Sequence, residues 1–440
     1  MAIKTLRIDN YRSIEHIEVT LGQLNAFVGR NNAGKSNILQ ALAIILGETW
    51  PSRPFTEKDF HKHDNTMPIN VAVVFDAPLD CDLEVYGFRL TYKADDDVEY
   101  VAIDVDWNDV LYPRGNFKRV SRQMRDEVVL LFLGIDRQAE KQLRPTQWTL
   151  YGRLLKRIEA QLDEEAVDTA YRDHIGPGVD PVEATINDFV QKQTGLNVKM
   201  VFSLLHPLEM LKGVRPYLIE DGMTFDAEEV GAGVQSALAL SIAKAYAEVV
   251  KKPLLLAMEE PELNLHPHAC RHFNALLRQL SEEGLQIIYT THERSFVDVG
   301  SYENIHLVRK WKGMTRVRSG SDLDDIEDKD RLKLLSKFNE RLNEVFFSSL
   351  VILCEGPADE IATRCVLEKL GIPLDRLNIS VLGMDSISDI PVPARLLKDF
   401  KIPTIALVDD DPGNPETKKT REKIISILTK DKVFVQDPHL

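Results

Sequence analysis

The stretch LNAFVGRNNAGKS, residues 24–36, decides the fold of the first part of the chain. Its short apolar run predicts a buried strand, and the apolar positions after Ser36 recur with the helical period, so a helix follows the loop. Gly29 and Gly34 permit the turns of the loop, and backbone N–H groups at a helix N-terminus favour phosphate. The alternative is a glycine-rich turn that arose by chance. The strand and the helix on its two sides favour a phosphate-binding P-loop.

Each residue type of a P-loop has a defined task. Lys35 supplies the positive charge that contacts the β- and γ-phosphates of a nucleotide, and the Ser36 hydroxyl binds Mg²⁺. Asn31 and Asn32 lie between the two glycines, and we assign them to the same nucleotide site. We therefore predict that this loop binds ATP together with Mg²⁺.

A second apolar run, residues 254–258, ends in the acidic sequence Glu-Glu-Pro-Glu. Carboxylates at the end of a strand suit Mg²⁺, so we assign Glu259 to the metal and Glu260 to orienting the attacking water. His292 follows a further apolar stretch, and a His at the end of a neighbouring parallel strand can reach a γ-phosphate. Taken alone, the acidic sequence also fits a solvated turn, and a lone His is usually structural.

Between these two halves, the sequence Gly-Ala-Gly233-Val-Gln235 opens an apolar stretch. The P-loop, this sequence, the acidic strand end and Thr-Thr-His292 occur in the order of the ABC-type ATPases, which the chain resembles. In that family this signature loop completes the nucleotide site of a partner. The resemblance implies a homodimer or larger homo-oligomer in which Gly233 and Gln235 face the partner's ATP. Glu259 stands where many members have Asp, and the signature lacks Leu-Ser-Gly-Gly, which favours slow ATP hydrolysis or none.

The interval between P-loop and signature contains no sustained heptads. Residues 71–75, 85–92 and 98–106 predict strands of a β-rich lobe. A helical insertion at about 145–200 follows, with leucines and an isoleucine at every fourth position, which we expect to be core, with a dimer contact as the alternative. Residues 319–346 are dense in charged side chains and predict a linker after an ATPase domain of residues 1–318.

A second set of acidic strand ends follows the linker. One apolar run leads into Glu355-Gly-Pro-Ala-Asp359, and a later run leads into Asp409-Asp-Asp411. Because ligand sites in open α/β sheets collect at the carboxyl ends of strands, we expect Glu355, Asp409 and Asp411 to lie close together. Oxygen ligands favour Mg²⁺ or Mn²⁺, and a pair of such ions can cleave a phosphodiester. The alternatives are a structural Mg²⁺ site or a domain that keeps the fold without the chemistry.

This pair of acidic motifs resembles the Toprim domain. An ABC-type head followed by Toprim resembles the OLD family (overcoming lysogenization defect) of ATP-regulated endonucleases, with members in bacterial anti-phage systems. The resemblance implies that Glu355 and Asp359 are the first metal ligands. It implies further that Asp409 and Asp411 are the second set, and that Glu355, Asp409 and Asp411 are catalytic.

The expected fold is therefore α/β, with a P-loop ATPase domain that carries a β-rich lobe and a helical insertion. A Toprim-like parallel α/β domain over residues 347–440 follows it. Toprim domains of the OLD type continue past the Asp-x-Asp strand to another acidic residue and a Lys. We therefore expect this domain to be incomplete at its C-terminus.

The formal net charge of −15 argues against generic binding of polyanions. A DNA contact then needs a local basic patch, for which residues 309–318 and 418–423 are candidates, although each also fits a solvated face. No apolar run approaches the ~20 residues of a membrane-spanning helix. The N-terminus has no signal-peptide pattern, so we expect a cytoplasmic protein without a membrane partner.

The function predicted from these motifs is an ATP-regulated, divalent-metal-dependent DNA endonuclease of anti-phage defence, which could bind a further defence-system subunit. Two alternatives stay open. One is an ATP-binding scaffold or sensor that holds a separate effector and cuts nothing. The other is a DNA-repair ATPase of the SMC-like group.

Overall fold

The structure is a computed structural model, and it describes residues 1–47, 50–52, 55–94, 97–134, 149–159, 214–227, 229–250, 254–263, 265–323, 342–410 and 414–436, with shorter stretches between 181 and 197. The chain forms two compact units. The first comprises Met1–Asp136 and Pro253–Leu440, and the second comprises Arg137–Lys252. Most of the predicted insertion, and residues 324–341 of the predicted linker, lie outside the described residues.

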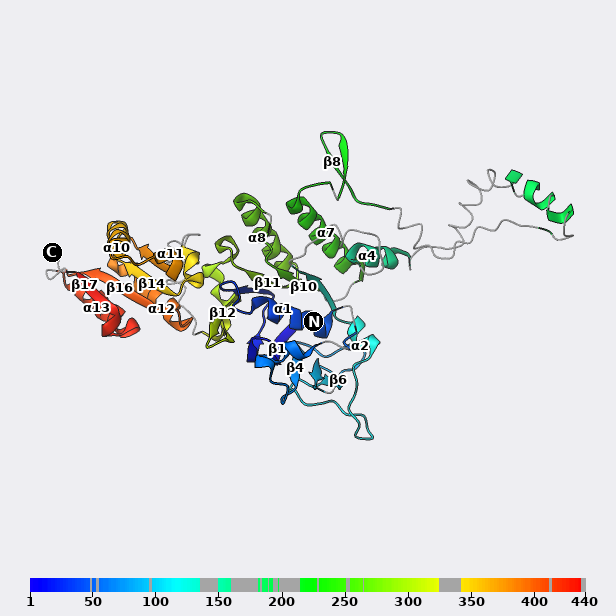
Figure 1. The fold of residues 1–440 in the computed structure, drawn as a ribbon, viewed down its shortest axis with the longest axis horizontal. Coiled ribbons are helices and arrows are strands. Elements are labelled where there is room, and N and C mark those ends of the chain that lie inside the picture. The colour runs from blue at the N-terminus through cyan, green and yellow to red at the C-terminus, as the bar shows by residue number, and fades with distance from the viewer. Residues whose placement is uncertain are drawn as a thin grey trace. The chain divides into compact units, whose positions relative to one another are not determined.

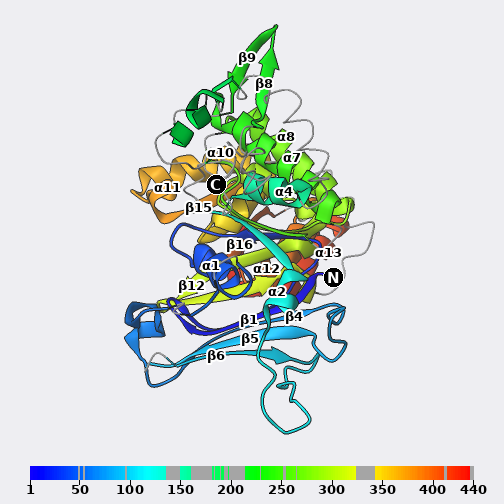
Figure 2. The same cartoon turned by 90° about the vertical axis from the view of Figure 1, so that its right-hand side faces the viewer.

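The first unit contains a five-stranded antiparallel sheet with the order β2-β1-β4-β5-β6. Its strands are β1 (Ile3–Tyr11), β2 (Ile14–Thr20), β4 (Ile69–Phe75), β5 (Gly87–Tyr92) and β6 (Val98–Ile103). This sheet is the predicted β-rich lobe, and Figure 2 shows it in blue to cyan beneath helix α1. The alternation of buried and exposed residues along β2 matches a sheet with one face toward a core.

A six-stranded sheet with the order β13-β12-β3-β11-β10-β7 carries the nucleotide motifs. Its strands are β3 (Leu24–Val28), β7 (Val129–Leu133), β10 (Leu254–Glu259), β11 (Gln286–Thr291), β12 (Ile305–Trp311) and β13 (Met314–Ser319). All neighbours pair in parallel except β12 and β13. The central strands β3, β10 and β11 are buried at every position, as expected of parallel strands covered on both faces.

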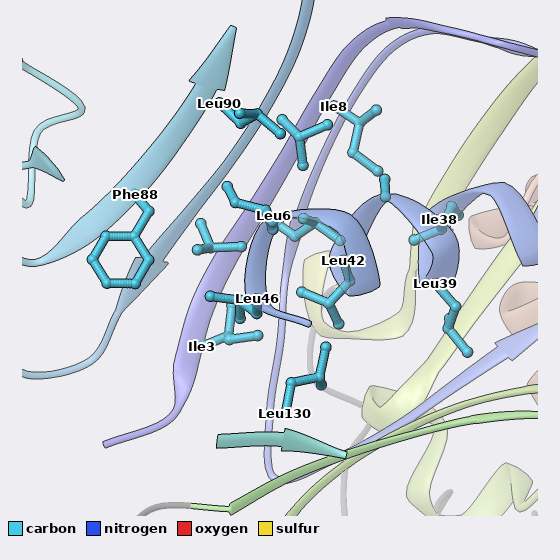
Figure 3. Packing of buried hydrophobic residues seen from close by; sticks show 14 of the residues in the cluster. Ile3, Leu6, Ile8, Ile38, Leu39, Leu42, Leu46, Phe88, Leu90 and Leu130 are labelled. Carbon is cyan, nitrogen blue, oxygen red and sulfur yellow. The ribbon is translucent and has the colours of Figure 1, made fainter. Parts of the chain in front are cut away.

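Helix α1 (Lys35–Leu46) packs between these two sheets, against β10 and β11 on one side and β1 and β4 on the other. Figure 3 shows Leu6 of β1, Leu42 of α1 and Leu130 of β7 in the cluster of buried residues that joins the three layers. Full burial of a leucine contributes about 1.5–3 kcal/mol. The packing therefore fixes the helix whose N-terminus follows the P-loop.

The first unit also contains further helices around these sheets, most of them short. They are η1 (Glu57–Asp59), η2 (His61–His63), α2 (Arg122–Asp126), α8 (Pro267–Glu282), η3 (Arg294–Phe296), η4 (Val299–Asn304), η5 (Gly320–Asp322) and η6 (Leu342–Phe347). The helix η6 leads directly into the C-terminal sheet.

The C-terminal sheet is parallel, with the order β15-β14-β16-β17. Its elements are β14 (Leu350–Cys354), α10 (Pro357–Lys369), α11 (Leu374–Leu377), β15 (Ile379–Gly383), η7 (Ile387–Asp389), α12 (Pro391–Asp399), β16 (Thr404–Asp409), α13 (Pro415–Leu428), η8 (Lys430–Lys432) and β17 (Val433–Gln436). Because β15 and β16 flank β14 on opposite sides, right-handed crossovers place α10 and α12 on opposite faces, as Figure 1 shows.

In the second unit, α4 (Leu150–Glu159) contacts α7 (Ala232–Val250). Leu154 of the predicted apolar stripe is buried, as expected of a core position. The strands β8 (Tyr217–Glu220) and β9 (Met223–Asp226) form an antiparallel hairpin. Within the described parts of both units, no helix is long and apolar enough to cross a membrane.

Candidate functional site

The P-loop begins directly after β3 and leaves no room for side chains at its two glycines. A Cβ atom at Gly29 would lie 2.2 Å from the carbonyl oxygen of Val308, and one at Gly34 would lie 2.1 Å from the Thr315 hydroxyl. Gly34 also has a φ of 104°, in the left-handed region that favours glycine. Asn31 and Asn32 between them are exposed. The hairpin of β12 and β13 therefore lies directly against the loop.

Two hydroxyl groups that sequence reasoning missed support the loop from this side. The buried Thr315 hydroxyl donates to the Ala33 carbonyl at 2.9 Å and lies 2.7 Å from the Ser13 hydroxyl. The Asn37 amide of α1 donates to the same Ser13 oxygen at 2.8 Å. These contacts fix the backbone just before Lys35. No sequence pattern marks either residue, because Ser13 lies in the turn between β1 and β2 and Thr315 lies in β13, far from the loop along the chain.

Lys35 is buried at the start of α1. Its ammonium group donates to the carbonyl oxygens of Gly29 at 2.7 Å and Arg30 at 3.0 Å. Burial lowers the pKa of Lys35, and the charges of Glu260 and Glu262 act in the opposite direction. The structure thus places the P-loop lysine in the field of the acidic strand end. Ser36, the next residue, is half-buried.

The strand register explains why these motifs meet. In the register, Glu259 of β10 pairs with Thr290 of β11, and Thr291 pairs with Val28 at the end of β3. The acidic sequence and the P-loop consequently leave the same carboxyl edge of the sheet. Glu259 is the last residue of β10 and is buried. At Glu260 the backbone leaves the direction of the strand, with a φ of 47°.

Glu262 holds His292, a role that sequence reasoning did not assign. One carboxylate oxygen of Glu262 accepts hydrogen bonds from the His292 backbone N–H and the Thr291 hydroxyl, each at 2.9 Å. The same oxygen lies 3.3 Å from His292 Nδ1, and a Glu260 oxygen lies 3.4 Å from that nitrogen. Burial raises the pKa of Glu262 despite these hydrogen bonds. The feature of the sequence that could have indicated this role is the third carboxylate of the Glu-Glu-Pro-Glu sequence.

The signature residues Gly233 and Gln235 lie in the first turn of α7, in the second unit. The Gln235 side-chain amide donates to the Val230 carbonyl at 3.0 Å, and its backbone N–H donates to Gly231 at 3.1 Å. These two hydrogen bonds stabilise the first turn of α7. The contact of Gly233 and Gln235 with a partner's nucleotide stays a prediction.

At the C-terminal sheet, the structure places Glu355 and Asp359 each near Asp409. The Asp409 backbone N–H at the end of β16 donates to Glu355, which follows β14, at 3.1 Å. Asp359 accepts from the Gly356 N–H at 2.9 Å. Burial and then the charge of Asp359 raise the pKa of Asp409, so these two carboxylates lie close enough to repel. Asp411 lies outside the described residues.

These carboxylates offer oxygen donors, which hard divalent cations prefer. The repulsion between Asp359 and Asp409 is the kind that a bound cation relieves. In the described part of the chain, no group of three or more His, Cys, Asp or Glu side chains is already arranged to hold a metal ion. Asp410 is not one of the predicted ligands, and its carboxylate pairs with Arg421 at 2.7 Å. The donor chemistry therefore fits Mg²⁺ or Mn²⁺, while the set described lacks Asp411.

A buried carboxylate that sequence reasoning missed supports this site. Glu360 of α10 accepts a hydrogen bond from the Gly383 N–H at 2.9 Å and lies 3.3 Å from Arg364. A Cβ at Gly383 would lie 2.5 Å from the Gly356 carbonyl oxygen. The end of β15 is thereby held against the loop between Glu355 and α10.

Three arginines of the first candidate basic patch contact other parts of the chain. Arg309 donates to the Ser348 carbonyl, Arg318 donates to the Asp399 carbonyl at 3.2 Å, and Arg316 lies 3.3 Å from Glu15. Residues 310–312 remain exposed at the end of β12 and the start of the turn to β13, where Trp311 has 65% of its surface exposed. In the second patch, Lys418, Lys419 and Lys423 are exposed on α13.

Comparisons with known proteins match both parts of the chain. Residues 24–298 match the family described as AAA domain, putative AbiEii toxin, Type IV TA system. Residues 346–411 match the family described as overcoming lysogenization defect protein-like, TOPRIM domain. The OLD nuclease of Thermus scotoductus is 30% identical over 484 residues, which cover 100% of this chain and 90% of that protein. Endonuclease GajA of Bacillus cereus is 24% identical over 84% of this chain and 68% of its own. The Old nuclease of Escherichia phage P2 is 22% identical over 93% and 77%, respectively.

Proposed function

The chain belongs to the OLD nuclease family, with an ATPase domain followed by a Toprim domain, and from this premise we propose that it is an ATP-regulated, Mg²⁺- or Mn²⁺-dependent DNA endonuclease of anti-phage defence. The observation that carries the proposal is that Glu355, which follows β14, and Asp359, in the first turn of α10, both lie near Asp409 at the end of β16. We place the ATPase domain at residues 1–318, the linker at 319–346 and the Toprim domain at 347–440.

At the nucleotide site, Lys35 would exchange the carbonyls of Gly29 and Arg30 for phosphate oxygens. Ser36 and Glu259 would hold Mg²⁺, which neutralises phosphate charge when bound. Glu260 would orient the attacking water, and His292, held by Glu262, would face the γ-phosphate. Asn31 and Asn32 are exposed between the loop glycines, and they would contact the nucleotide.

At the Toprim site, Glu355 and Asp359 would form the first set of ligands, and Asp409 with Asp411 the second. The ions, when bound, stabilise the attacking and leaving oxygens of a phosphodiester. The residues of the chain place the carboxylates: the Asp409 N–H orients Glu355, and the Gly356 N–H orients Asp359.

For partners, we propose a homodimer in which Gly233 and Gln235 of one chain face the ATP of the other. DNA would contact the exposed lysines of α13, which precede the C-terminal strand β17, and the turn at residues 310–312, where an exposed Trp can stack on a base between two Lys. A further defence-system subunit would be an additional partner.

A plasmid-nicking assay tests the proposal. Purified protein is incubated with supercoiled DNA and Mg²⁺ or Mn²⁺, with and without ATP. We expect cutting by the wild type and its loss in Glu355→Ala and in Asp409→Ala, since each change removes a proposed ligand. Glu368→Ala, which removes an exposed carboxylate of α10, is the matched control and should cut as the wild type does. If the wild type cuts with neither metal in either nucleotide state, the nuclease proposal fails and the scaffold alternative takes its place.

A further inference from the structure

The strand that leads to Glu355 is held at its start by the ATPase domain. Ser348 and Ser349 directly precede β14, and Glu355 directly follows it. Arg30, the second residue of the P-loop, donates from Nη1 to the Ser349 hydroxyl at 3.0 Å. Arg309 of β12 donates to the Ser348 carbonyl. Two guanidinium groups beside the nucleotide site thus contact the first residues of the nuclease domain.

These two serines are anchored within the C-terminal domain. The Ser349 N–H donates to the Asn378 carbonyl at 2.7 Å, next to the start of β15. The Ser348 hydroxyl lies 2.6 Å from that of Ser380, which donates to Glu344 of η6 at 2.7 Å. A displacement of Ser349 would therefore move the start of the sheet and would not be absorbed by a loose loop.

The strand β14 is short and well supported. It has 5 residues, pairs with β15 and β16 on its two sides, and is buried at four of its positions, from Val351 to Cys354. At about 3.3 Å per residue, the path from Ser349 to Glu355 is about 20 Å. A paired and buried strand of this length carries a shift at one end to its other end.

Arg30 contacts the P-loop lysine and the start of the nuclease domain through different atoms. Its carbonyl oxygen accepts a hydrogen bond from Lys35 Nζ at 3.0 Å, while its guanidinium reaches Ser349. The Lys of a P-loop contacts the phosphates when a nucleotide is bound. Binding would consequently remove the Lys35 contact from the backbone of the residue that contacts Ser349.

The positive charges at this contact also favour a response to the nucleotide. Both acceptors, the Ser349 hydroxyl and the Ser348 carbonyl, are neutral. Among the residues that the structure describes, neither Arg30 nor Arg309 forms an ion pair with a carboxylate. Burial lowers the pKa of Arg309, and the positive charge of Arg30 adds to this effect, so the two guanidinium groups repel. The negative charge of a nucleotide at the adjacent loop would reduce that repulsion.

On the basis of the proposed ATPase and nuclease activities, we propose that Arg30 is a positioning residue that links the nucleotide state of the P-loop to β14, and thereby to the placement of Glu355. The contact with Ser349 is the link. Coupling between two binding sites is reciprocal. DNA and metal at the Toprim site would therefore change the affinity for nucleotide by the factor by which nucleotide changes the affinity of the Toprim site for them.

The first test follows hydrogen exchange in the segment 342–349, with and without a non-hydrolysable ATP analogue. In the wild type, the nucleotide should change the exchange of this segment. Ser349→Ala, which removes only the hydroxyl, should lose that change. Ser426→Ala is the matched control, because its hydroxyl bonds within α13. This measurement needs no nuclease activity, so it decides the link even if the protein cuts no DNA.

The second test compares cleavage rates with and without ATP. Coupling between sites is typically about 5- to 150-fold, so the wild-type ratio should differ from one by at least about fivefold. Ser349→Ala should keep its cleavage without ATP, while its ratio falls to within about twofold of one. Arg30→Ala should reduce the ratio in the same way, and Arg316→Ala, an arginine that contacts Glu15 instead, should not. A wild-type response to nucleotide in Ser349→Ala in the first test, or in both Ser349→Ala and Arg30→Ala in the second, would overturn the proposal, as would a wild type without any response.

Discussion

Removing the Glu262 carboxylate should destabilise the nucleotide site on the His292 side. With Ala at this position, the backbone N–H of His292 loses its acceptor at 2.9 Å. The Thr291 hydroxyl loses its acceptor at 2.9 Å and keeps only the Glu293 carbonyl at 3.4 Å. A hydrogen bond to a charged group contributes about 1.5–3 kcal/mol, and water can replace the acceptor at the exposed His292 but not at the buried Thr291, so Glu262→Ala should destabilise this domain by about 2–4 kcal/mol.

Glu262→Gln separates the hydrogen bonds from the charge. The amide oxygen can keep both hydrogen bonds, so the variant should lie within about 1 kcal/mol of the wild type at neutral pH. Burial raises the pKa of Glu262, which means that the folded state binds its proton more tightly than the unfolded state. Wild-type stability from this group is therefore greatest below the normal pKa of glutamate and is lost as pH rises through the raised pKa. Glutamine has no such proton, so its variant should lack that slope.

Thermal unfolding of the three proteins between about pH 4 and 8 measures both effects, and phosphate release measures the catalytic consequence. ATP hydrolysis should fall more in Glu262→Ala than in Glu262→Gln, because only glutamine keeps His292 in place. Two results would refute the reasoning: an alanine variant as stable as the wild type, or a glutamine variant with the wild-type pH slope.

Three further outcomes are expected. Lys35→Ala should lose most of its ATP affinity, since it removes the phosphate-facing charge and keeps the glycines, and calorimetry that shows wild-type affinity would contradict the P-loop assignment. Glu260→Gln should bind ATP and hydrolyse it more slowly, because the amide keeps the shape but cannot act as a base; an unchanged rate of phosphate release would transfer that role to another residue. Gly34→Ala should also fail to bind ATP, since its Cβ would lie 2.1 Å from the Thr315 hydroxyl, and a nucleotide-protection melt that equals the wild type would show that β13 moves away from the loop.

The family and the order of the domains were predictable because strand-end motifs carry their own geometry. The prediction of a P-loop ATPase domain followed by a Toprim-like α/β domain is confirmed. Parallel strands bring their carboxyl ends to one edge, so Glu259 and the P-loop meet there without any long-range information. Glu355 and Asp409 meet for the same reason.

Element boundaries were less predictable, since local side-chain hydrogen bonds decide them. The expected strand 98–106 ends at Ile103, because the Asp104 carboxylate accepts the backbone N–H groups of Asp106 and Asn108 at 2.9 Å and forms a turn. Contacts between distant segments were not predictable at all. Thr315 supports the P-loop and Arg309 contacts Ser348, although the sequence indicated only a candidate basic patch for the stretch 309–318.

The two acidic sites differ in how their charges are balanced, and this difference bears on their chemistry. At the nucleotide site, Glu260 and Glu262 act on Lys35, a cation that the chain itself supplies. At the Toprim site, Arg421 pairs with Asp410, while burial and then the charge of Asp359 raise the pKa of Asp409. The first set of carboxylates therefore acts on a cation of the chain itself, whereas in the second set a like charge adds to the raised pKa of Asp409. Because a bound cation relieves repulsion between carboxylates, we expect a cation requirement that is stricter for cleavage than for nucleotide binding.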